Sequence, residues 1–333
     1  MLPLALPHLV LALLLAACTE TAPAPDVSIE PQASVVSAEE AADAPVIVPP
    51  AADAVAFTTD STTATTYREI MNAAAAAGVA ARPYGEIVQW TAEQLLGRPY
   101  VAGMLDAPEE ETLVLDLTRF DCVLLIENVL AIARQIALGE RGYDGYAAGV
   151  QALRYRDGQM DGYCSRLHYF TDWIRDNQRR GAMTDVTSQI GGEVFDKRLD
   201  FMSTHRGSYP RMASDAVYAC VVGTERALAA GGEIHHIPQA RIAAAYDGMQ
   251  AGDIVATTTS IGGLDVTHTG FVHRDGRRTG FLHASSASNA VKISPDLQAY
   301  VEGIRSQVGV VIVRPTDPRA GRASGEQGAA SGE

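Results

Sequence analysis

The chain has 333 residues with 26 basic and 40 acidic side chains, which gives a formal net charge of −14. An acidic chain lacks the positive charge that contacts to nucleic-acid phosphates require, so we expect no nucleic-acid partner. Hydrophobic residues make up 47% of the sequence, enough for a packed core, and four cysteines are too few for a disulfide-built scaffold of this size.

The first 17 residues are typical of a signal peptide. Their apolar run is too short for a comfortable membrane span. The residues Leu15-Ala16-Ala17-Cys18 resemble a bacterial lipobox, in which the cysteine is lipidated. This resemblance implies a lipid anchor on Cys18, and Thr19 after it implies delivery to the periplasmic face of the outer membrane. A plain signal peptide with an incidental cysteine is the alternative.

The segment 18–66 has the composition of a disordered tether. Between Thr19 and Phe57 it holds seven acidic residues, no basic residue and many Ala and Pro. The last residues, 316–333, are rich in Gly, Ala and Ser and predict a disordered tail. The folded domain is therefore expected at 67–315.

Helical patterns dominate the first half of this domain. The run from Cys122 to Leu138 is apolar on almost every side, which predicts a central buried helix. Ser165 is a candidate cap for a later helix that buries Phe170 and Ile174. Short runs rich in Val, Ile and Thr follow, with connections too short for crossover helices. Helices followed by antiparallel strands predict an α+β fold. The expected strands are Asp253–Thr259, Val266–His273, Gly280–Ser285, Val291–Ser294 and Val308–Arg314.

Cys122 is a candidate nucleophile because it opens the central helix. The positive end of a helix dipole lowers the pKa of a thiol, and free N–H groups in the first turn can hold an oxyanion. The alternative is a buried structural cysteine.

His268 and His283 form the second half of the candidate site. They flank Asp275-Gly276, which is a hairpin turn signal. If these two residues form the turn, the histidines lie directly opposite each other; a looser turn makes them diagonal neighbours. A thiol needs such an imidazole as base, and the imidazole needs a polar group to fix its tautomer. A chance pairing and a metal pair are the alternatives, although the remaining metal ligands are missing.

A helix cysteine followed by two strand histidines is the order found in papain-like enzymes of the NlpC type. Several motifs in order also resemble the bacterial N-acetylmuramoyl-L-alanine amidase-like family. Carried over by position, the resemblance implies Cys122 as nucleophile, His268 as base and His283 as third member. The matching segments are 97–103, 117–123, 166–174, 199–205, 252–255, 263–268 and 282–286.

The same resemblance suggests that Arg166 and His168 line a substrate groove, where a cationic group suits peptide carboxylates. Tyr100 is a candidate donor near the scissile carbonyl, and Asp265 is a candidate for either the groove or a turn. Each of these side chains has an ordinary packing role as its alternative. Cys164 and Cys220 are equally compatible with a disulfide and with two free thiols.

The function expected from these features is hydrolysis of the N-acetylmuramoyl-L-alanine amide bond of muropeptides through a thioester. The resemblance, rather than composition or spacing, implies the bond that is cut. An endopeptidase acting within the stem peptide and a wall-binding lipoprotein with an inactive site are the alternatives. We expect a monomer that needs no cofactor and no metal.

Overall fold

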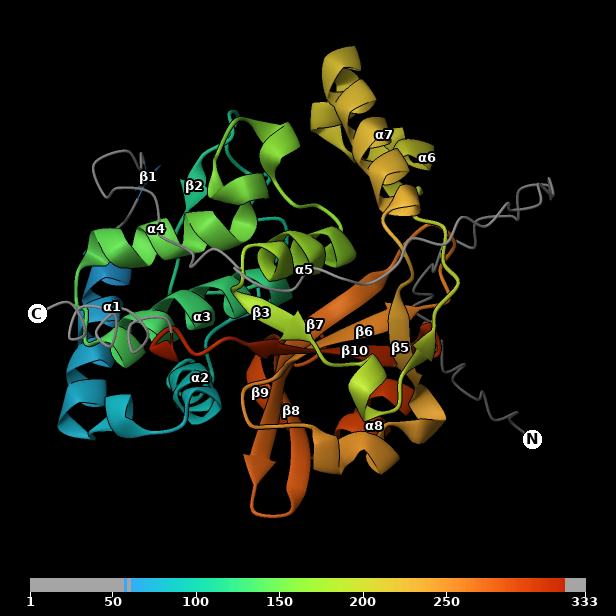
Figure 1. Ribbon diagram of the computed structural model, residues 1–333. Helices are drawn as coiled ribbons and strands as arrows, with labels where there is room; N and C mark the ends of the chain where they lie inside the picture. Colours follow the sequence, from blue (N-terminus) through green and yellow to red (C-terminus); the bar gives the residue numbers. More distant parts are fainter. Residues whose placement is uncertain (1–56, 59–60, 321–333) are drawn as a thin grey trace, which may run out of the picture. The chain divides into compact units, whose positions relative to one another are not determined.

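The computed structural model describes residues 57–58 and 61–320 (Figure 1). The expected signal peptide, the lipidation site Cys18 and most of the expected tether lie outside the described residues. None of the described helices is both long enough and apolar enough for a membrane crossing.

The ends of the folded domain differ from the expected 67–315. Helix α1 spans Ser61–Ala76, and the hydroxyl of its Thr63 accepts a hydrogen bond from the Leu117 N–H. At the other end, the Arg319 guanidinium donates to the carbonyl oxygen of Ala80 at 2.8 Å. The domain therefore includes residues 61–66 and 316–320, which the Ala- and Thr-rich composition at one end and the Gly- and Ser-rich composition at the other concealed.

Helix α3, Cys122–Leu138, has the bounds that the apolar run predicts. Asp121 caps its first turn, because one carboxylate oxygen accepts from the Leu124 N–H at 2.8 Å. The helix ends at Gly139, whose φ of 69° is readily adopted only by glycine. Its side chains are buried on nearly every side because α2, α4 and strand β7 all pack against it.

The other helices surround α3 or lie later in the chain, and short 3-10 turns connect several of them. In Figure 1, α1 to α4 gather on one side of the sheet. The expected cap Ser165 instead lies in a 3-10 turn, Tyr163–Ser165, and the next helix begins only at Phe170. The remaining α-helices are α2 (Tyr84–Glu93), α4 (Tyr143–Arg154), α5 (Phe170–Arg179), α6 (Phe201–Thr204), α7 (Asp215–Ala230) and α8 (Leu297–Glu302).

The main sheet is antiparallel throughout, as the short connections predict. Its strands follow the order β4-β5-β10-β6-β7-β8-β9, and β3 also pairs with β10. A separate parallel pair joins β1 (Phe57–Thr58) to β2 (Leu113–Val114). The sheet strands are β3 (Met183–Asp185), β4 (Glu193–Val194), β5 (His235–Pro238), β6 (Ile254–Thr259), β7 (Val266–Asp275), β8 (Arg278–Ser285), β9 (Ala290–Ser294) and β10 (Gln307–Pro315).

Both faces of the sheet are covered, so consecutive residues are buried along β6 and along most of β8. Phe271 and Leu282 belong to the core shared with α3. Val272 and Phe281 belong to a second core, on the other face, which α8 covers through Val301 and neighbouring residues. The region where β7 and β8 meet both α3 and α8 holds the candidate site.

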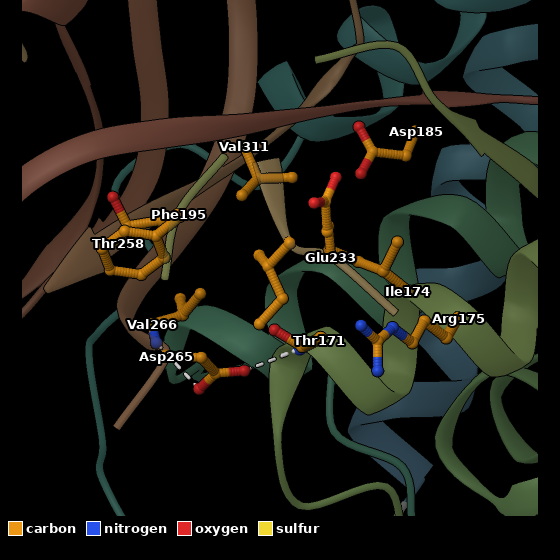
Figure 2. A pocket seen from close by; sticks show the side chains of 11 residues that line it. Thr171, Ile174, Arg175, Asp185, Phe195, Glu233, Thr258, Asp265, Val266 and Val311 are labelled. Carbon is orange, nitrogen blue, oxygen red and sulfur yellow. Dashed lines mark hydrogen bonds between the residues drawn. The ribbon is translucent and has the colours of Figure 1, made fainter. Parts of the chain in front are cut away.

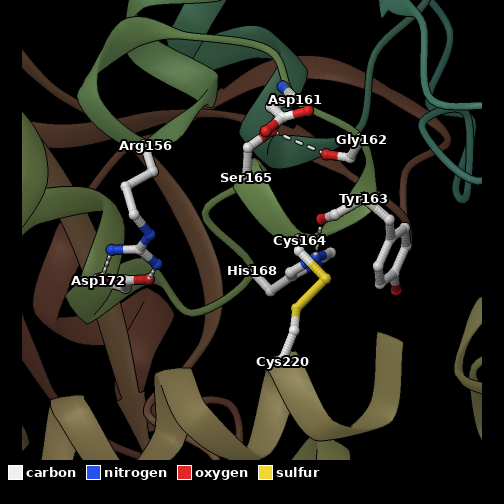
Figure 3. Close-up of a disulfide and its surroundings, with 9 residues drawn as sticks. All are labelled: Arg156, Asp161, Gly162, Tyr163, Cys164, Ser165, His168, Asp172 and Cys220. Carbon is white, nitrogen blue, oxygen red and sulfur yellow. Dashed lines mark hydrogen bonds and ion pairs between the residues drawn. A yellow bond between two sulfur atoms is a disulfide. The ribbon is translucent and has the colours of Figure 1, made fainter. Parts of the chain in front are cut away.

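The segment around α6 and α7 has a small apolar core of its own, which includes Met202 and Val221. A disulfide between Cys164 and Cys220 ties α7 to the turn before α5 (Figure 3). The structure thus decides between the two possibilities that the sequence left open for these cysteines. We call residues 199–230 with this disulfide the α6–α7 region.

Candidate active site

Cys122 is the first residue of α3 and the free cysteine among the described residues. Its side chain is half-buried, and its backbone carbonyl accepts a hydrogen bond from the Thr269 hydroxyl at 3.1 Å. This bond joins the start of the helix to the β7 residue that directly follows His268. The structure therefore brings the expected nucleophile and the expected base onto two elements in contact.

The pKa of the Cys122 thiol runs against the expectation from its helix position. Burial, together with the nearby Asp121 carboxylate, raises this pKa to about 11, although hydrogen bonds from Thr269 act in the opposite direction. The expectation of a lowered pKa is thus wrong for the unliganded protein. The reason is that the carboxylate capping the helix stands beside the thiol and, together with burial, outweighs the helix terminus.

The β7–β8 hairpin has a two-residue turn that lies one position later than the expected Asp275-Gly276 turn, and its register is the one that the looser turn would also have given. Asp275 pairs with Arg278, so Gly276 and Arg277 form the tip. His268 and His283 are consequently diagonal neighbours rather than directly opposed residues. Their rings still meet, because the side chains point to the same face of the sheet and are long enough to span the diagonal.

The two imidazoles are joined by a short hydrogen bond. His268 Nε2 lies 2.7 Å from His283 Nδ1, and His283 Nε2 lies 3.1 Å from the Ser294 Oγ. Phe281 stacks on His283 with ring centroids 4.6 Å apart, and Tyr300 approaches the same ring at 4.7 Å. The rings of Phe281 and Tyr300 and the two hydrogen bonds thus fix the orientation of the His283 ring. Nδ1 of His268 is left as the ring nitrogen available for a further partner.

A glycine allows this packing. A Cβ on Gly270, two residues after His268 on the same face, would lie 2.5 Å from the Phe281 ring and 2.5 Å from the Leu282 carbonyl oxygen. Any side chain there would push Phe281 away and disturb the face that holds His283.

Both histidines favour the neutral form. Burial lowers the pKa of His268 to about 4. Burial, then the neighbouring His268 and Lys292, lower the pKa of His283 to about 3. At neutral pH the resting site therefore contains a thiol and two uncharged imidazoles, each of which carries one N–H.

Tyr300 adjoins both halves of the site. Its ring lies 6.0 Å from that of His268. Burial raises the pKa of Tyr300 to about 12, a hydrogen bond from Gln307 opposes the rise, and the charge of a Cys122 thiolate adds to it. The thiol nevertheless makes no hydrogen bond to either imidazole within the described residues, so proton transfer requires a shift of one side chain toward the other.

Tyr100 pairs with Phe120, two residues before Cys122. The N–H of Val101 donates to the Phe120 carbonyl, and the Phe120 N–H donates to Pro99, so this short stretch runs alongside the residues preceding Cys122. Burial raises the pKa of Tyr100, and the Cys122 thiolate and Asp121 carboxylate contribute to the rise. The phenol is therefore a neutral donor near the thiol.

Arg166 and His168 precede α5 rather than open it, and both are engaged within the protein. Arg166 pairs with Asp106 at 2.6 Å and lies 3.4 Å from Glu111. The Nε2 atom of His168 lies 2.9 Å from the Tyr163 carbonyl oxygen, and burial lowers the pKa of His168 to about 4. The guanidinium is not a free cation in this state, and the role of both residues in substrate binding stays a prediction.

Asp265 is buried and accepts hydrogen bonds from two backbone N–H groups (Figure 2). One carboxylate oxygen accepts from the Thr171 N–H at 2.7 Å, in the first turn of α5, and the other accepts from the Val266 N–H at 2.8 Å. Asp265 thus caps α5 from a different part of the chain. It also lines a small cavity of about 40 Å³ under β6, on the side of α5.

Residues 57–58 and 61–320 contain no group of three or more His, Cys, Asp or Glu side chains placed to hold a metal ion. The two histidines bond to each other and to Ser294, so their ring edges are largely used.

Two contributors were missed from the sequence, Ser294 and Tyr300. The pairing of Ser285 with Ala290 sets Ser294 opposite Phe281 and diagonal to His283. The hairpin arithmetic that related the two histidines would have found Ser294 if it had been applied to the next turn. Tyr300 comes from a six-residue helix, for which the sequence carries no comparable signal.

Comparison with known proteins decides the family. The model of the AmiA-like, N-acetylmuramoyl-L-alanine amidase-like family matches residues 91–309. The chain belongs to this family. This membership confirms the resemblance that the ordered motifs gave, at the level of the amidase-like family.

Solved structures agree with this assignment. An N-acetylmuramoyl-L-alanine amidase from Bacteroides uniformis is 33% identical, with a TM-score of 0.66, and the match covers 70% of this chain and 99% of that one. A protein from Bacteroides fragilis that carries a xylanase name is 32% identical, with a TM-score of 0.59 and coverage of 67% and 99%. A Legionella pneumophila protein, 18% identical with a TM-score of 0.55, shares the fold. No curated protein matches the sequence.

Proposed function

We propose that this protein is a cell-wall amidase that cleaves the bond between the lactyl group of N-acetylmuramic acid and L-alanine in muropeptides. We also propose a papain-like architecture of the NlpC type, with Cys122, His268 and His283 as the reacting set. Family membership and the name of the Bacteroides uniformis structure support the substrate class. The observation that carries the mechanism is the 2.7 Å bond from His268 Nε2 to His283, which leaves Nδ1 of His268 for the thiol proton.

In the acylation step, Nδ1 of His268 takes the Cys122 proton while the sulfur attacks the amide carbonyl. A neutral thiol with a pKa of about 11 and a base with a pKa of about 4 do not form a stable ion pair before substrate binds. Proton transfer therefore accompanies formation of the S–C bond. Thiol–imidazole hydrogen bonds are often long without substrate and tighten in the complex.

The oxyanion that forms on the carbonyl needs a donor in the first turn of α3. Asp121 already engages the Leu124 N–H, which leaves the N–H of Cys122 itself as the backbone donor closest to the sulfur. Tyr100, a neutral phenol beside the thiol, supplies a second donor.

Collapse of the intermediate breaks the C–N bond, and His268 passes its proton to the departing amine of L-alanine. The products at this stage are a free peptide and a muramoyl thioester on Cys122. Water then attacks the thioester, His268 takes a proton from that water, and the thiolate leaves with this proton restored to sulfur. Atoms and protons balance with water as the sole co-reactant.

Arg166 is the proposed contact for a carboxylate of the stem peptide. Its partner Asp106 is 53% exposed, so an incoming carboxylate can compete for the guanidinium at the surface. Glu111 would stay in place beneath, because it is 5% exposed.

Defined muropeptides digested with the full chain and analysed by mass spectrometry test the bond that is cut. An amidase releases an intact peptide that begins with L-alanine, whereas an endopeptidase leaves L-alanine on the sugar. Cys122→Ala should bind the muropeptide without turnover. Cleavage within the peptide would support the endopeptidase, and binding with no turnover by the unaltered protein would support an inactive wall-binding protein.

Metal dependence is a separate test. We expect EDTA to leave the cleavage rate unchanged, because a thiol nucleophile and an imidazole base complete the reaction. Loss of activity with EDTA and its return with zinc would contradict the cysteine mechanism.

We propose a lipid anchor on Cys18 and a location on the periplasmic face of the outer membrane from the lipobox-like sequence. Cys18→Ser should move the protein from the membrane fraction to the soluble fraction. Membrane association that is unaffected by this change would remove the anchor from the account.

A further inference from the structure

Ser294 ends strand β9 and is 9% exposed. Its hydroxyl oxygen lies 3.1 Å from Nε2 of His283, the ring nitrogen on the side away from His268. The register, in which Phe281 pairs with Ser294, brings the serine onto the same face as His283. A continuous chain of hydrogen bonds therefore runs from His268 through His283 to Ser294.

The hydrogen bonds in this series can be donated in either of two directions. Each neutral imidazole has one N–H, so a proton on Nδ1 of His283 forces Nε2 of His268 to accept and places the His268 proton on Nδ1. That arrangement blocks the nitrogen that must take the thiol proton. In the opposite arrangement His268 donates from Nε2, His283 accepts at Nδ1 and donates from Nε2, and the chain needs an acceptor at its end.

We propose that Ser294 is that acceptor, a positioning residue that acts through His283 to keep Nδ1 of His268 unprotonated. This inference rests on the proposed function, since it assigns His268 as the base. Phe281 stacks on His283, and Tyr300 meets the same ring at an interplanar angle of 61°. Within the part of the chain that the structure describes, Ser294 is the hydrogen-bond partner of His283 Nε2, so it sets the direction at this end of the hydrogen-bond series.

The test uses the full chain with ¹⁵N-labelled histidine, in the unaltered protein and in a Cys122→Ala background. The ¹⁵N chemical shift separates protonated from bare ring nitrogens, and we expect Nε2 to be the protonated nitrogen in both His268 and His283. Ser294→Ala should shift both rings toward the Nδ1–H form. It should lower kcat roughly tenfold with little change in KM, because an unpaired buried donor costs about that factor in tautomer populations.

Ser294→Thr keeps the hydroxyl and should restore both the spectrum and kcat. Ser286→Ala, in the exposed turn of the same hairpin, is the matched control and should change neither. A proton on Nδ1 of His283 in the unaltered protein would overturn the proposal, whether or not the Ser294→Ala protein folds. Unchanged tautomers and an unchanged kcat in Ser294→Ala would also overturn it.

The outcome can be separated from failure of the proposed function. If Cys122→Ala kept full activity, the cysteine mechanism would fail, yet the spectra would still report whether Ser294 sets the two tautomers. If Cys122→Ala were inactive and Ser294→Ala were unchanged in both readouts, the cysteine mechanism would stand and the role of Ser294 would fall.

Discussion

The β7–β8 hairpin and the α6–α7 region are stabilised in different ways. The hairpin lies between two apolar cores, and its position follows from burial on both faces of the sheet. The α6–α7 region has a small core and depends on specific bonds: the Cys164–Cys220 disulfide and a buried contact in which the Tyr169 hydroxyl donates to Glu225 at 2.7 Å. The groups proposed to react therefore lie on elements that pack in the two large apolar cores, whereas the α6–α7 region relies on specific bonds.

The largest expected effect belongs to the hairpin. His268→Ala removes the proposed base, so kcat/KM should fall by about 10³-fold, within the range for loss of general acid–base catalysis. The half-buried position of His268 should keep the thermal midpoint close to that of the unaltered protein. Steady-state kinetics on muropeptides with a parallel melting curve gives both values, and activity within tenfold of the unaltered protein would remove His268 from the reaction.

Removing the disulfide tests the stability of the α6–α7 region separately from that of the β7–β8 hairpin. The Cys164→Ser and Cys220→Ser double variant frees a 56-residue interval and should lower the free energy of unfolding by about 4 kcal/mol in the chain-entropy model. Amide hydrogen exchange should show the loss concentrated in α7 and not in β7 or β8. Equal loss of protection in the hairpin would mean that the two regions unfold as one unit.

A pH-dependent effect of intermediate size is expected at His168, next to the disulfide. The pKa of this half-buried side chain is lowered to about 4 from an ordinary value of 6.5, so the unfolded state binds the proton more readily. Its stabilising contribution is present above pH 6.5 and is lost as pH falls toward 4. His168→Gln should therefore reduce the loss of unfolding free energy between pH 8 and pH 5 by about 2 kcal/mol, measured by denaturant unfolding at the two pH values. A parallel decline in both proteins would contradict the assignment.

The smallest expected effect concerns the thiol. Asp121→Asn keeps an oxygen that can accept from the Leu124 N–H, so helix capping should change little. It removes the carboxylate that helps raise the pKa of Cys122, so this pKa should fall. The rate of alkylation by iodoacetamide as a function of pH measures the shift, and an unchanged or raised midpoint would show that Asp121 does not act on the thiol.

The β7–β8 hairpin and helix α3 could be predicted from the sequence better than the α6–α7 region, because their signals are local. The apolar run of α3 and the short β-branched runs of the sheet are strong local signals, and the position of Cys122 at the start of the helix followed from them. The histidine pairing followed from a turn signal, within one register step. The thiol pKa did not follow, because it depends on burial by side chains from distant parts of the chain.

The α6–α7 region resisted prediction because its main bonds join residues far apart in the sequence. Cys164 and Cys220 are 56 positions apart, and so are Tyr169 and Glu225. No local sequence pattern predicts a partner at such a distance along the chain. The predicted domain boundaries differ from the observed ones for a related reason. Residues 61–66 and 316–320 are held by contacts with other elements, whereas their composition is that of a linker.

Trapping the acyl-enzyme is the most direct test of whether Cys122 forms a thioester with the muramoyl group. The full chain is mixed with a defined muropeptide, quenched with acid within one turnover, and examined by mass spectrometry after proteolysis. We expect a muramoyl group attached to the peptide that contains Cys122, release of a peptide that begins with L-alanine, and no adduct in Cys122→Ala. Cleavage by Cys122→Ala at the unaltered rate, with no adduct on Cys122 in either protein, would contradict it.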